Sequence, residues 1–436
     1  MNGENEVLVQ TDRGTPCGEL MRRYWQPAAL SEELPQGGAP LPVRLLGEDL
    51  VLFRDDQGQP GLLGIHCSHR GADLSYGRVE DGGLRCIYHG WLYDIHGHCL
   101  DQPAEPGGGE HRDSIRHPAY PCHERAGVIF AYMGPGENPL FPNFEFLPVN
   151  TNLVFAEKRF HECNYLQGSE GNYELYHLSF LHYNYKNRGI GGGWQGIDAT
   201  APEEGLSGRG GAPGVETVDA ELKSFGVRCY KIRRGMGPDK YQLYINDFIL
   251  PSITAFPGAL KGKGGYTAHW HVPIDDTHHW KYTFTFSKGG PLDKELLRSR
   301  EDPLTADYKP TRNKANRYLQ DRESMKKESF SGIESSKGVG LNFQAQDRCV
   351  VEGPGPIQDR TQEHLVSMDK LIVVGRKVLL KAIRDVQQGA DPSNVVRDPQ
   401  LNRFPIVVFN GVLPTSKDWK EVSKELETEA GGENRF

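Results

Sequence analysis

The sequence has no long apolar run, because no stretch of 18 consecutive apolar residues occurs in its 436 residues. A helix needs roughly 20 such residues to cross a bilayer, so we expect no membrane span. The first residues, MNGENEVLVQTDRG, are polar and acidic. They resemble neither a signal peptide nor a transit peptide, which favours a cytoplasmic location.

Runs of Lys and Arg are also missing, and the formal net charge is −8. Nucleic acids and anionic membranes attract basic patches, so neither is an expected partner. Cysteine is scarce, with 8 residues in the chain, which argues against a secreted disulfide framework. These absences together predict a reduced, cytoplasmic protein.

The chain is too long for one ordinary domain. Between about 40 and 135, short alternating runs such as VRLLGEDLVLFRD are separated by Gly, Asp and Pro, which predicts a small antiparallel β domain. Later runs, among them KYQLYINDFILP and HHWKYTFTFSK, predict a larger antiparallel sheet. The expected class is therefore α+β, with helices around the larger sheet.

Two segments are expected to be helical, 164–183 and 359–388, and Gly389 follows the second segment where a helix C-cap belongs. A Gly-rich stretch at 189–214 predicts a loop. Residues 289–330 are rich in Pro and in both charges, which predicts an excursion across the surface or at a subunit interface.

Two Cys and two His form a spaced motif inside the predicted small β domain. Cys67 and His69 form a C-x-H pair, and Cys86 and His89 form a C-x-x-H pair. One Zn²⁺ ion held by a Cys2His2 set is one interpretation. The order of the ligands favours a second interpretation, a [2Fe–2S] cluster with two Cys on one iron and two His on the other. Such a cluster takes one Cys and one His from each of two loops.

A second motif follows the first, Glu174-x-x-His177-x-x-x-x-His182. Two His and one carboxylate make the facial triad of non-haem Fe(II), which leaves positions open for dioxygen and substrate. Glu174 lies three residues before His177 and is better placed to orient a ligand than to be one. Taken alone, two His spaced by five residues are weak evidence, since they are also found on ordinary surfaces and in cores.

With both motifs in one chain, the sequence resembles the terminal oxygenase subunits of the Rieske non-haem iron oxygenases, and in particular the phthalate dioxygenase type that lacks a β subunit. The resemblance runs nearly end to end, through TPCGELMRRYWQPA, NYLQGSEGNYELYHLSFLH, FILPSITAFPG and QDRCVVEGPGPIQDRTQEHL. It implies that Cys67, His69, Cys86 and His89 hold the cluster and that His177 and His182 bind the iron.

The resemblance also implies a third iron ligand, a downstream Asp in a Q-D element. Asp347 matches it, with Glu352 and Asp359 as rivals, although Asp359 reads more simply as a helix N-cap. The family usually has Asp at the position of Glu174, where it links a cluster His of one subunit to an iron His of its neighbour. We expect Glu174 to keep this electron-transfer role with a different pH dependence.

The implied domains are an N-terminal segment, 1–40, packed on the catalytic domain, a Rieske domain, 41–145, and a catalytic mononuclear iron domain, 146–436. The implied cofactors are a [2Fe–2S] cluster and mononuclear Fe(II), with O2 as co-substrate. Electrons would come from NAD(P)H through a flavin and iron–sulfur reductase, or a ferredoxin plus reductase. Transfer between subunits implies a head-to-tail ring, and a homotrimer is the expected form.

The implied reaction is hydroxylation or oxidative O- or N-dealkylation of a small aromatic compound. The expected pocket includes Asn164, Asn246 and Asp247, and an inward Asp would repel a carboxylate, which hints at a neutral substrate. The arginines near this strand oppose the hint if they face the pocket, although surface positions are the simpler expectation: Arg209, Arg228, Arg233 and Arg234. The alternatives are a dioxygenase of an aromatic carboxylate such as phthalate, and an electron carrier without catalytic iron.

Overall fold

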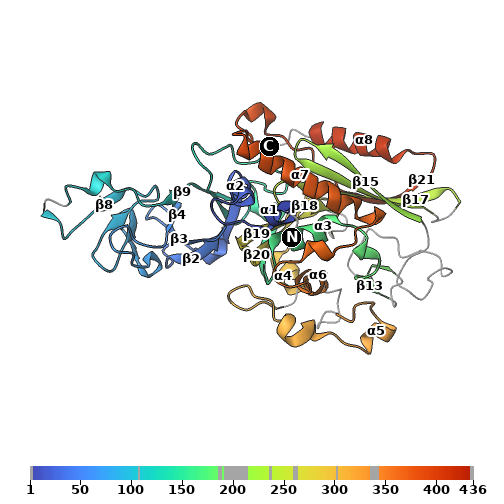
Figure 1. Ribbon diagram of the computed structural model, residues 1–436, viewed down its shortest axis with the longest axis horizontal. Helices are drawn as coiled ribbons and strands as arrows, with labels where there is room; N and C mark the ends of the chain where they lie inside the picture. Colours follow the sequence, from blue (N-terminus) through green and yellow to red (C-terminus); the bar gives the residue numbers. More distant parts are fainter. Residues whose placement is uncertain are drawn as a thin grey trace.

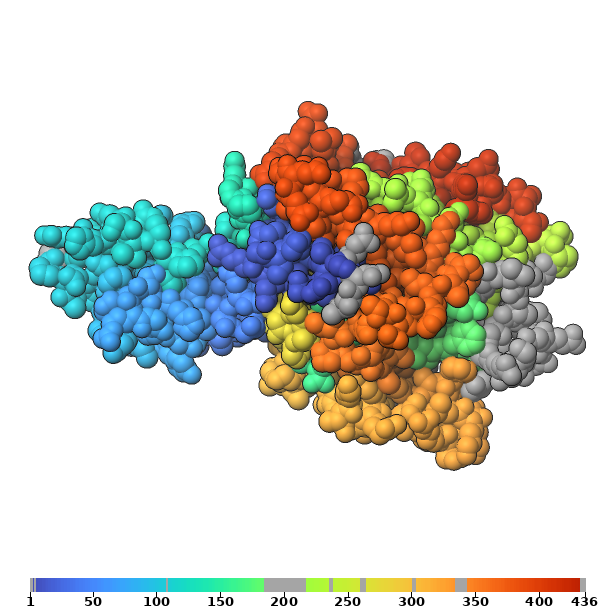
Figure 2. Space-filling model, in the orientation of Figure 1, coloured from blue at the N-terminus to red at the C-terminus, as the bar shows by residue number. Residues whose placement is uncertain are grey.

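The computed structural model describes residues 3–106, 109–184, 189–190, 215–234, 238–258, 264–300, 303–333 and 343–432. A small lobe of β-strands projects from one end of a larger body of sheet and helices, as Figure 1 shows in ribbon form and Figure 2 in space-filling form. The small antiparallel lobe and the larger antiparallel sheet with helices confirm the predicted α+β class. Within the described ranges, no helix is long and apolar enough to cross a membrane.

The small lobe consists of two four-stranded antiparallel sheets, with strand orders β2-β3-β4-β9 and β5-β6-β7-β8. Their strands are β2 Leu41–Leu45, β3 Glu48–Arg54, β4 Pro60–Gly64, β5 Arg78–Glu80, β6 Gly83–Arg85, β7 Leu92–Tyr93, β8 Cys99–Asp101 and β9 Ala119–Tyr120. Alternate residues point inward, so that Val51, Phe53, Leu63 and Leu84 form a separate core with Cys67 and Cys86. The core therefore positions the Cys/His motif.

A three-stranded sheet connects the lobe to the body. β1 Trp25–Leu30 and β10 Cys122–Arg125 both pair with β11 Val128–Tyr132. Trp25 is buried at the edge of this sheet, donates its indole N–H to the carbonyl of Pro139 at 3.1 Å, and packs on Tyr132 and Phe141. Before β1, α1 Gly3–Val9 and α2 Pro16–Arg22 pack on α7 Lys370–Gln387 of the body. The boundaries at 40/41 and 145/146 stay predictions.

The larger body is built on one antiparallel sheet with the order β12-β20-β19-β18-β17-β16-β15, and β21 pairs with β17. The strands are β12 Val154–His161, β15 Val215–Lys223, β16 Gly226–Arg234, β17 Lys240–Ile249, β18 Ile253–Phe256, β19 Tyr266–Asp275, β20 His278–Phe286 and β21 Phe409–Pro414. A two-stranded ribbon, β13 Tyr183–Asn184 with β14 Gly189–Ile190, lies apart from it.

Helices cover both faces of this sheet. α3 Tyr165–Tyr173 and α7 Lys370–Gln387 lie on one face, where Tyr173 packs on Phe248. α8 Trp419–Gly432 covers the other face, where Trp419 and Val422 pack with Tyr230. The remaining helices are α4 Lys294–Arg300, α5 Ser324–Lys327 and α6 Phe343–Glu352.

Two predicted helices are shorter than expected. The segment 164–183 is helical only over Tyr165–Tyr173 and resumes as a 3₁₀ turn at His177–Ser179. The segment 359–388 becomes an α-helix only at Lys370, because Leu365 and Val366 are exposed and no apolar stripe anchors the earlier residues. Gly389 does follow α7 with a φ of 81°, as a C-cap requires. The loop predicted at 189–214 lies outside the described residues, apart from β14.

Candidate metal centres

The four residues of the first motif lie on two loops that close in the same way. The N–H of Cys67 donates to the carbonyl of Ala72 and the N–H of Cys86 to that of Trp91, each at 2.8 Å. Four residues after each Cys, a Gly at positive φ donates back to the carbonyl of that Cys; these are Gly71 and Gly90. Each loop thus presents one buried thiol and one partly exposed imidazole.

The imidazoles and thiols have different surroundings. The rings of His69 and His89 lie 4.4 Å apart, and Trp91 stacks on His69 at 4.6 Å. On the inner side, the hydroxyl of Tyr93 lies 3.2 Å from Sγ of Cys67. Tyr93 is itself stacked on His117, whose ring bonds Ser68 and the carbonyl of Gly64. The thiol end of the site is therefore dry and the imidazole end faces solvent.

The four ligand atoms do not gather around one point. Across the described residues, only His177, His182 and Asp347 bring three ligand atoms within 4.8 Å of one another. A single tetrahedral zinc ion would hold all four atoms of the Cys/His motif within roughly 4 Å of each other. The separation fits a group with two metal ions, one for the thiolates and one for the imidazoles.

The second motif lies where α3 ends. Asn164 caps the start of this helix by accepting from the N–H of Leu166, and Glu174 is the residue at which the helix stops. Because the helix ends there, His177 lies on a 3₁₀ turn and His182 on the tight turn that follows it. Their five-residue spacing therefore needs no bend within a continuous helix.

Asp347 of α6 joins the two histidines. Its Oδ1 lies 3.0 Å from Nε2 of His182 and 3.9 Å from Nε2 of His177, and the two rings are 5.2 Å apart. Three ligand atoms that face one point, two imidazole nitrogens and one carboxylate oxygen, match the donor set of non-haem iron and leave the opposite side open. This geometry supports the assignment of Asp347 as the third ligand.

The other nitrogen of each histidine is held by an acceptor. Nδ1 of His177 donates to Glu174 at 2.8 Å, and Nδ1 of His182 donates to Oε1 of Gln346 at 2.6 Å. Such partners fix the tautomer, so that Nε2 carries the lone pair that a metal needs. Burial alone would raise the pKa of Glu174. The interaction with His177 and the hydrogen bonds that the Glu174 carboxylate accepts outweigh burial, and they lower the pKa of Glu174.

The sequence alone did not identify Gln346 as a functional residue. The only feature of the sequence that indicates it is its position directly before Asp347.

The two rival carboxylates, Glu352 and Asp359, make contacts elsewhere in the fold. Glu352 is buried and accepts from the N–H of Glu162 and the hydroxyl of Tyr318. Asp359 caps a 3₁₀ turn, Arg360–Gln362, by accepting from the N–H of Thr361.

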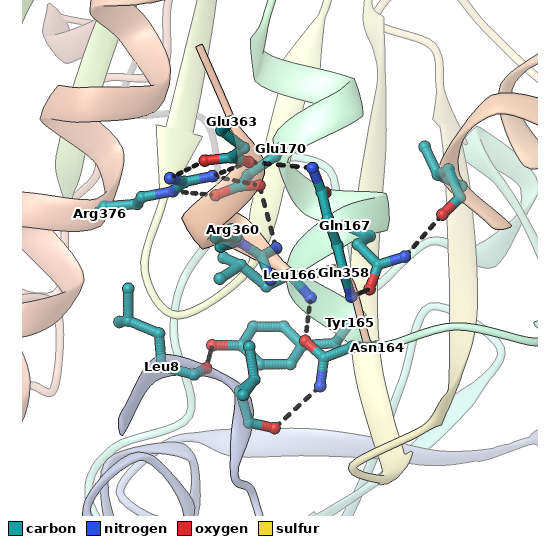
Figure 3. Close-up of polar contacts among 12 residues, drawn as sticks. Leu8, Asn164, Tyr165, Leu166, Gln167, Glu170, Gln358, Arg360, Glu363 and Arg376 are labelled. Atoms are coloured by element: carbon teal, nitrogen blue, oxygen red, sulfur yellow. Dashed lines mark hydrogen bonds and ion pairs between the residues drawn. The ribbon is translucent and has the colours of Figure 1, made fainter. Parts of the chain in front are cut away.

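Buried ionic contacts hold α3, which precedes the metal site, against its neighbours (Figure 3). Both oxygens of Glu170 accept from Arg376 of α7, at 2.6 and 3.1 Å, and Arg360 adds a third bond at 3.1 Å. At the other end of α3, Tyr165 donates to the carbonyl of Leu8. The helix is thereby attached both to α7 and to the N-terminal segment.

Of the three residues expected in the substrate pocket, two are engaged in polar contacts within the fold and one has no hydrogen-bond partner among the described residues. The Asn164 amide donates to the carbonyls of Val9 and Asp276. The Asp247 carboxylate pairs with Arg228 through bonds of 2.8 and 2.9 Å. Asn246 is fully buried, and neither amide atom has a hydrogen-bond partner in the described protein. The ion pair removes the reason for expecting a neutral substrate.

Two of the arginines near this strand do not have the expected surface positions. Arg228 and Arg233 are buried, whereas Arg234 is exposed. Arg209 lies outside the described residues. Lys231, two residues before Arg233 on β16, is also buried, and its ammonium donates to the carbonyl of Leu175 at 3.0 Å and to the Ser179 hydroxyl at 2.8 Å. It therefore lies beside the turn that carries His177.

Comparison with known proteins covers nearly the whole chain. Residues 24–121 match the family model described as "Rieske [2Fe-2S] domain", and residues 131–434 match "LigXa C-terminal domain like". The phthalate 4,5-dioxygenase oxygenase subunit of Pseudomonas putida is 33% identical over 432 residues, which cover 96% of this chain and 93% of that protein. The 3-chlorobenzoate-3,4-dioxygenase oxygenase subunit of Comamonas testosteroni is 33% identical, with 96% of each chain covered.

Among solved structures, the oxygenase in a complex with the ferredoxin of carbazole 1,9a-dioxygenase has the same fold. Its TM-score is 0.54 at 19% identity, with 88% of this chain and 95% of that chain covered.

Proposed function

Since this chain belongs to the Rieske non-haem iron oxygenases, we propose that it is the terminal oxygenase for an aromatic carboxylate. Family membership makes it an enzyme with a [2Fe–2S] cluster, a mononuclear iron and O2 as co-substrate, and it overturns the zinc-module and electron-carrier alternatives. When bound, the cluster supplies one-electron transfer and the iron supplies dioxygen activation.

The observation that carries the substrate class is the polar composition of one sheet face. Lys231 and Arg233 are two residues apart on β16, so their side chains leave the same face of the sheet, the one opposite to α8. Asn246 lies directly opposite Cys229 on β17, so it belongs to this face too. Buried cationic groups beside an iron site provide the charge that a carboxylate needs. Relatives named for phthalate and 3-chlorobenzoate support this choice.

A substrate panel tests the proposal directly. Phthalate and 3-chlorobenzoate would be compared with their methyl esters, with product and NADH consumption both measured. We expect the acids to be oxidised and the esters to be poor substrates. In Lys231→Met, the KM for the acid is expected to rise about tenfold or more, because a charge-assisted contact is lost. Arg234→Met, on the same strand but exposed, is the matched control. Equal turnover of acid and ester would refute the proposal.

Electrons arrive from a separate redox protein, either a reductase or a ferredoxin. We propose further that the cluster passes them to the iron of a neighbouring subunit in a head-to-tail homotrimer. Ile87 and Tyr88, which precede His89, are 62% and 57% exposed, so the cluster loop lies at the surface. Glu174 is 17% exposed and bonds His177, so a neighbour's cluster loop can reach it. The cytoplasmic location stays a prediction.

Mixing two inactive variants tests the head-to-tail arrangement. Cys86→Ser lacks the cluster and His177→Ala lacks an iron ligand, so each alone is expected to be inactive. When the two variants are co-expressed and form one oligomer, the intact cluster of one subunit can lie next to the intact iron site of another. Activity should then return. Absence of recovery, in mixed oligomers verified by mass, would show that transfer occurs within one subunit.

A further inference from the structure

The face of the sheet beneath α3 is polar beside the metal site. Neighbouring strands β12, β20 and β19 pair in register, with His161 opposite His279 and Lys281 opposite both Arg159 and His271. Directly paired residues point to the same side of a sheet. The buried side chains on this face are Arg159, His161, His269, His271, His279 and Lys281. Burying so many ionisable groups is costly unless they bond each other or water, and neither iron binding nor electron transfer uses them.

His271 and His279 are joined directly. Nδ1 of His271 lies 2.9 Å from Nε2 of His279, so one proton lies between the two rings. Gly168 of α3 lies over this contact, and a Cβ there would come within 2.6 Å of both nitrogens. Only Gly allows α3 to approach the pair this closely.

The hydrogen bonds that His271 and His279 make to other residues determine how many protons the two rings hold. Nδ1 of His279 donates to the carbonyl of Cys163 at 2.8 Å, so Nε2 of a neutral His279 must accept. His271 then donates through Nδ1, and its Nε2 must accept as well. The side-chain amide of Asn172 lies 2.7 Å from Nε2 of His271. The same amide lies 2.8 Å from Nδ1 of His269.

The orientation of the Asn172 amide distinguishes two states of the histidine pair that differ by one proton. When its Nδ2 faces the rings, it donates to both, and His271 and His279 are neutral. When its Oδ1 faces them instead, both rings donate to it, and the pair must hold one additional proton. The distances of 2.7 and 2.8 Å suit either orientation of the amide. Turning this single amide therefore accompanies the gain or loss of one proton.

A pocket of about 100 Å³ connects this pair to the metal site. His161 and His271 line one side and His177 and Asp347 line another. Both ring nitrogens of His161 are buried without a hydrogen-bond partner in the described protein. Since buried polar atoms are satisfied by protein or water, and a water fills about 30 Å³, the pocket has room for roughly three waters.

We propose that His271, His279 and Asn172 form a store for one proton that serves oxygen reduction at the neighbouring metal site through the water of this pocket. The inference rests on the proposed function of that site. Dihydroxylation consumes one O2, two electrons from the redox partner and two protons, and both oxygen atoms enter the product. The store supplies one of the protons: it leaves Nε2 of His271, and the pair returns to its neutral form.

The charges around the histidine pair allow it to gain and then release a proton. Burial lowers the pKa of His271 and His279, and Lys281 lowers both further. Arg159 and Arg348 add positive charge near His161 and His269, whereas Asp347 opposes them at His269. The pair is therefore neutral at rest, and the negative charge brought by each electron favours its protonation.

The first test uses the full-length chain with its cluster intact and the mononuclear iron removed, labelled with ¹⁵N-histidine. The N–H···N proton between the rings should give a resonance far downfield of the backbone amides. His279→Gln should abolish it. His278→Gln is the matched control, because this neighbour on β20 is 39% exposed and bonds Asp275 instead.

The second test is the solvent isotope effect and pH profile of oxygen consumption by the iron-loaded enzyme with its reductase. Oxygen consumption with release of H2O2 also takes up two protons, so this measurement does not depend on the correct aromatic acid. In His279→Gln we expect a rate about tenfold lower, a larger solvent isotope effect and an optimum at lower pH. His278→Gln should match the wild type.

The outcomes separate the two proposals. A downfield resonance that His279→Gln removes, with isotope effect and pH profile unchanged, would show a purely structural pair and overturn the store. Absence of the resonance in the wild type would overturn it as well. A store that behaves as expected in an enzyme that oxidises no aromatic acid would overturn only the proposed substrate class. Iron and sulfide contents confirm that each variant is folded and loaded.

Discussion

The hydroxyl of Tyr93 lies 3.2 Å from Sγ of Cys67, inside the core of the small lobe. A hydrogen bond to a cluster thiolate stabilises the more negative, reduced form, so it raises the reduction potential. Tyr93→Phe removes this donor while keeping the stacked ring. We expect the potential to fall by about 40 mV, which corresponds to roughly 1 kcal/mol for one electron.

A redox titration followed by the cluster spectrum would measure this change, with Tyr76→Phe as control because Tyr76 is 72% exposed. A potential that is the same in Tyr93→Phe and wild type would show that the hydroxyl does not influence the cluster.

Gln346 is expected to control iron affinity through His182. Gln346→Leu leaves Nδ1 of His182 without its acceptor, so the ring can rotate or change tautomer. We expect the dissociation constant for Fe(II) to rise about 10-fold to 100-fold, without loss of the cluster. Gln346→Glu keeps the acceptor for His182 but loses the bond that Nε2 donates to the carbonyl of Ile333, and it should bind iron more tightly than the Leu variant. Equal affinities in the Leu and Glu variants would contradict this role.

Glu170 is expected to stabilise the domain that holds the metal site. Glu170→Gln leaves Arg360 and Arg376 without their shared carboxylate, and both are largely buried. Removing one partner of a buried ion pair costs about 3 kcal/mol or more in the free energy of unfolding. Asp385→Asn, which breaks an exposed pair with Lys381, should cost less than about 1 kcal/mol. Denaturant unfolding of both variants would distinguish these costs.

The buried imidazoles predict a loss of stability in acid. Burial lowers the pKa of His279 to about 3 and those of His161, His269 and His271 well below 6.5. In the unfolded chain they titrate near 6.5, so below that pH the unfolded state binds protons that the folded state does not. Each contributes a loss of about 1.4 kcal/mol per pH unit, beginning near pH 6.5 and ending, for His279, near pH 3.

Denaturant unfolding between pH 8 and 5 would measure this dependence. His161→Phe should have a shallower slope than the wild type, because it removes one of the buried imidazoles. A wild-type stability that stays constant below pH 6 would refute the prediction.

Local patterns predicted the two metal sites, and long-range pairing explains what they missed. The spacings of Cys67 and His69, and of Cys86 and His89, lie within single loops, so the sequence contains their geometry directly. Asp347 came from resemblance, because nothing local connects α6 to His177. The interpretation of Asp247 failed for a related reason: its partner Arg228 is on the adjacent strand, and strand register is not visible in one sequence. The same register brings His271 to His279.

The contact of the first two helices with α7 determines when this protein can be completed. α1 and α2 pack on α7, and Leu20 and Met21 of α2 are fully buried. During synthesis α1 and α2 leave the ribosome well before their partner α7. The small lobe lies between them in the chain and can form its sheets in the meantime. The apolar face of α2 therefore waits uncovered until α7 emerges, and this early segment is among the last to reach its final place.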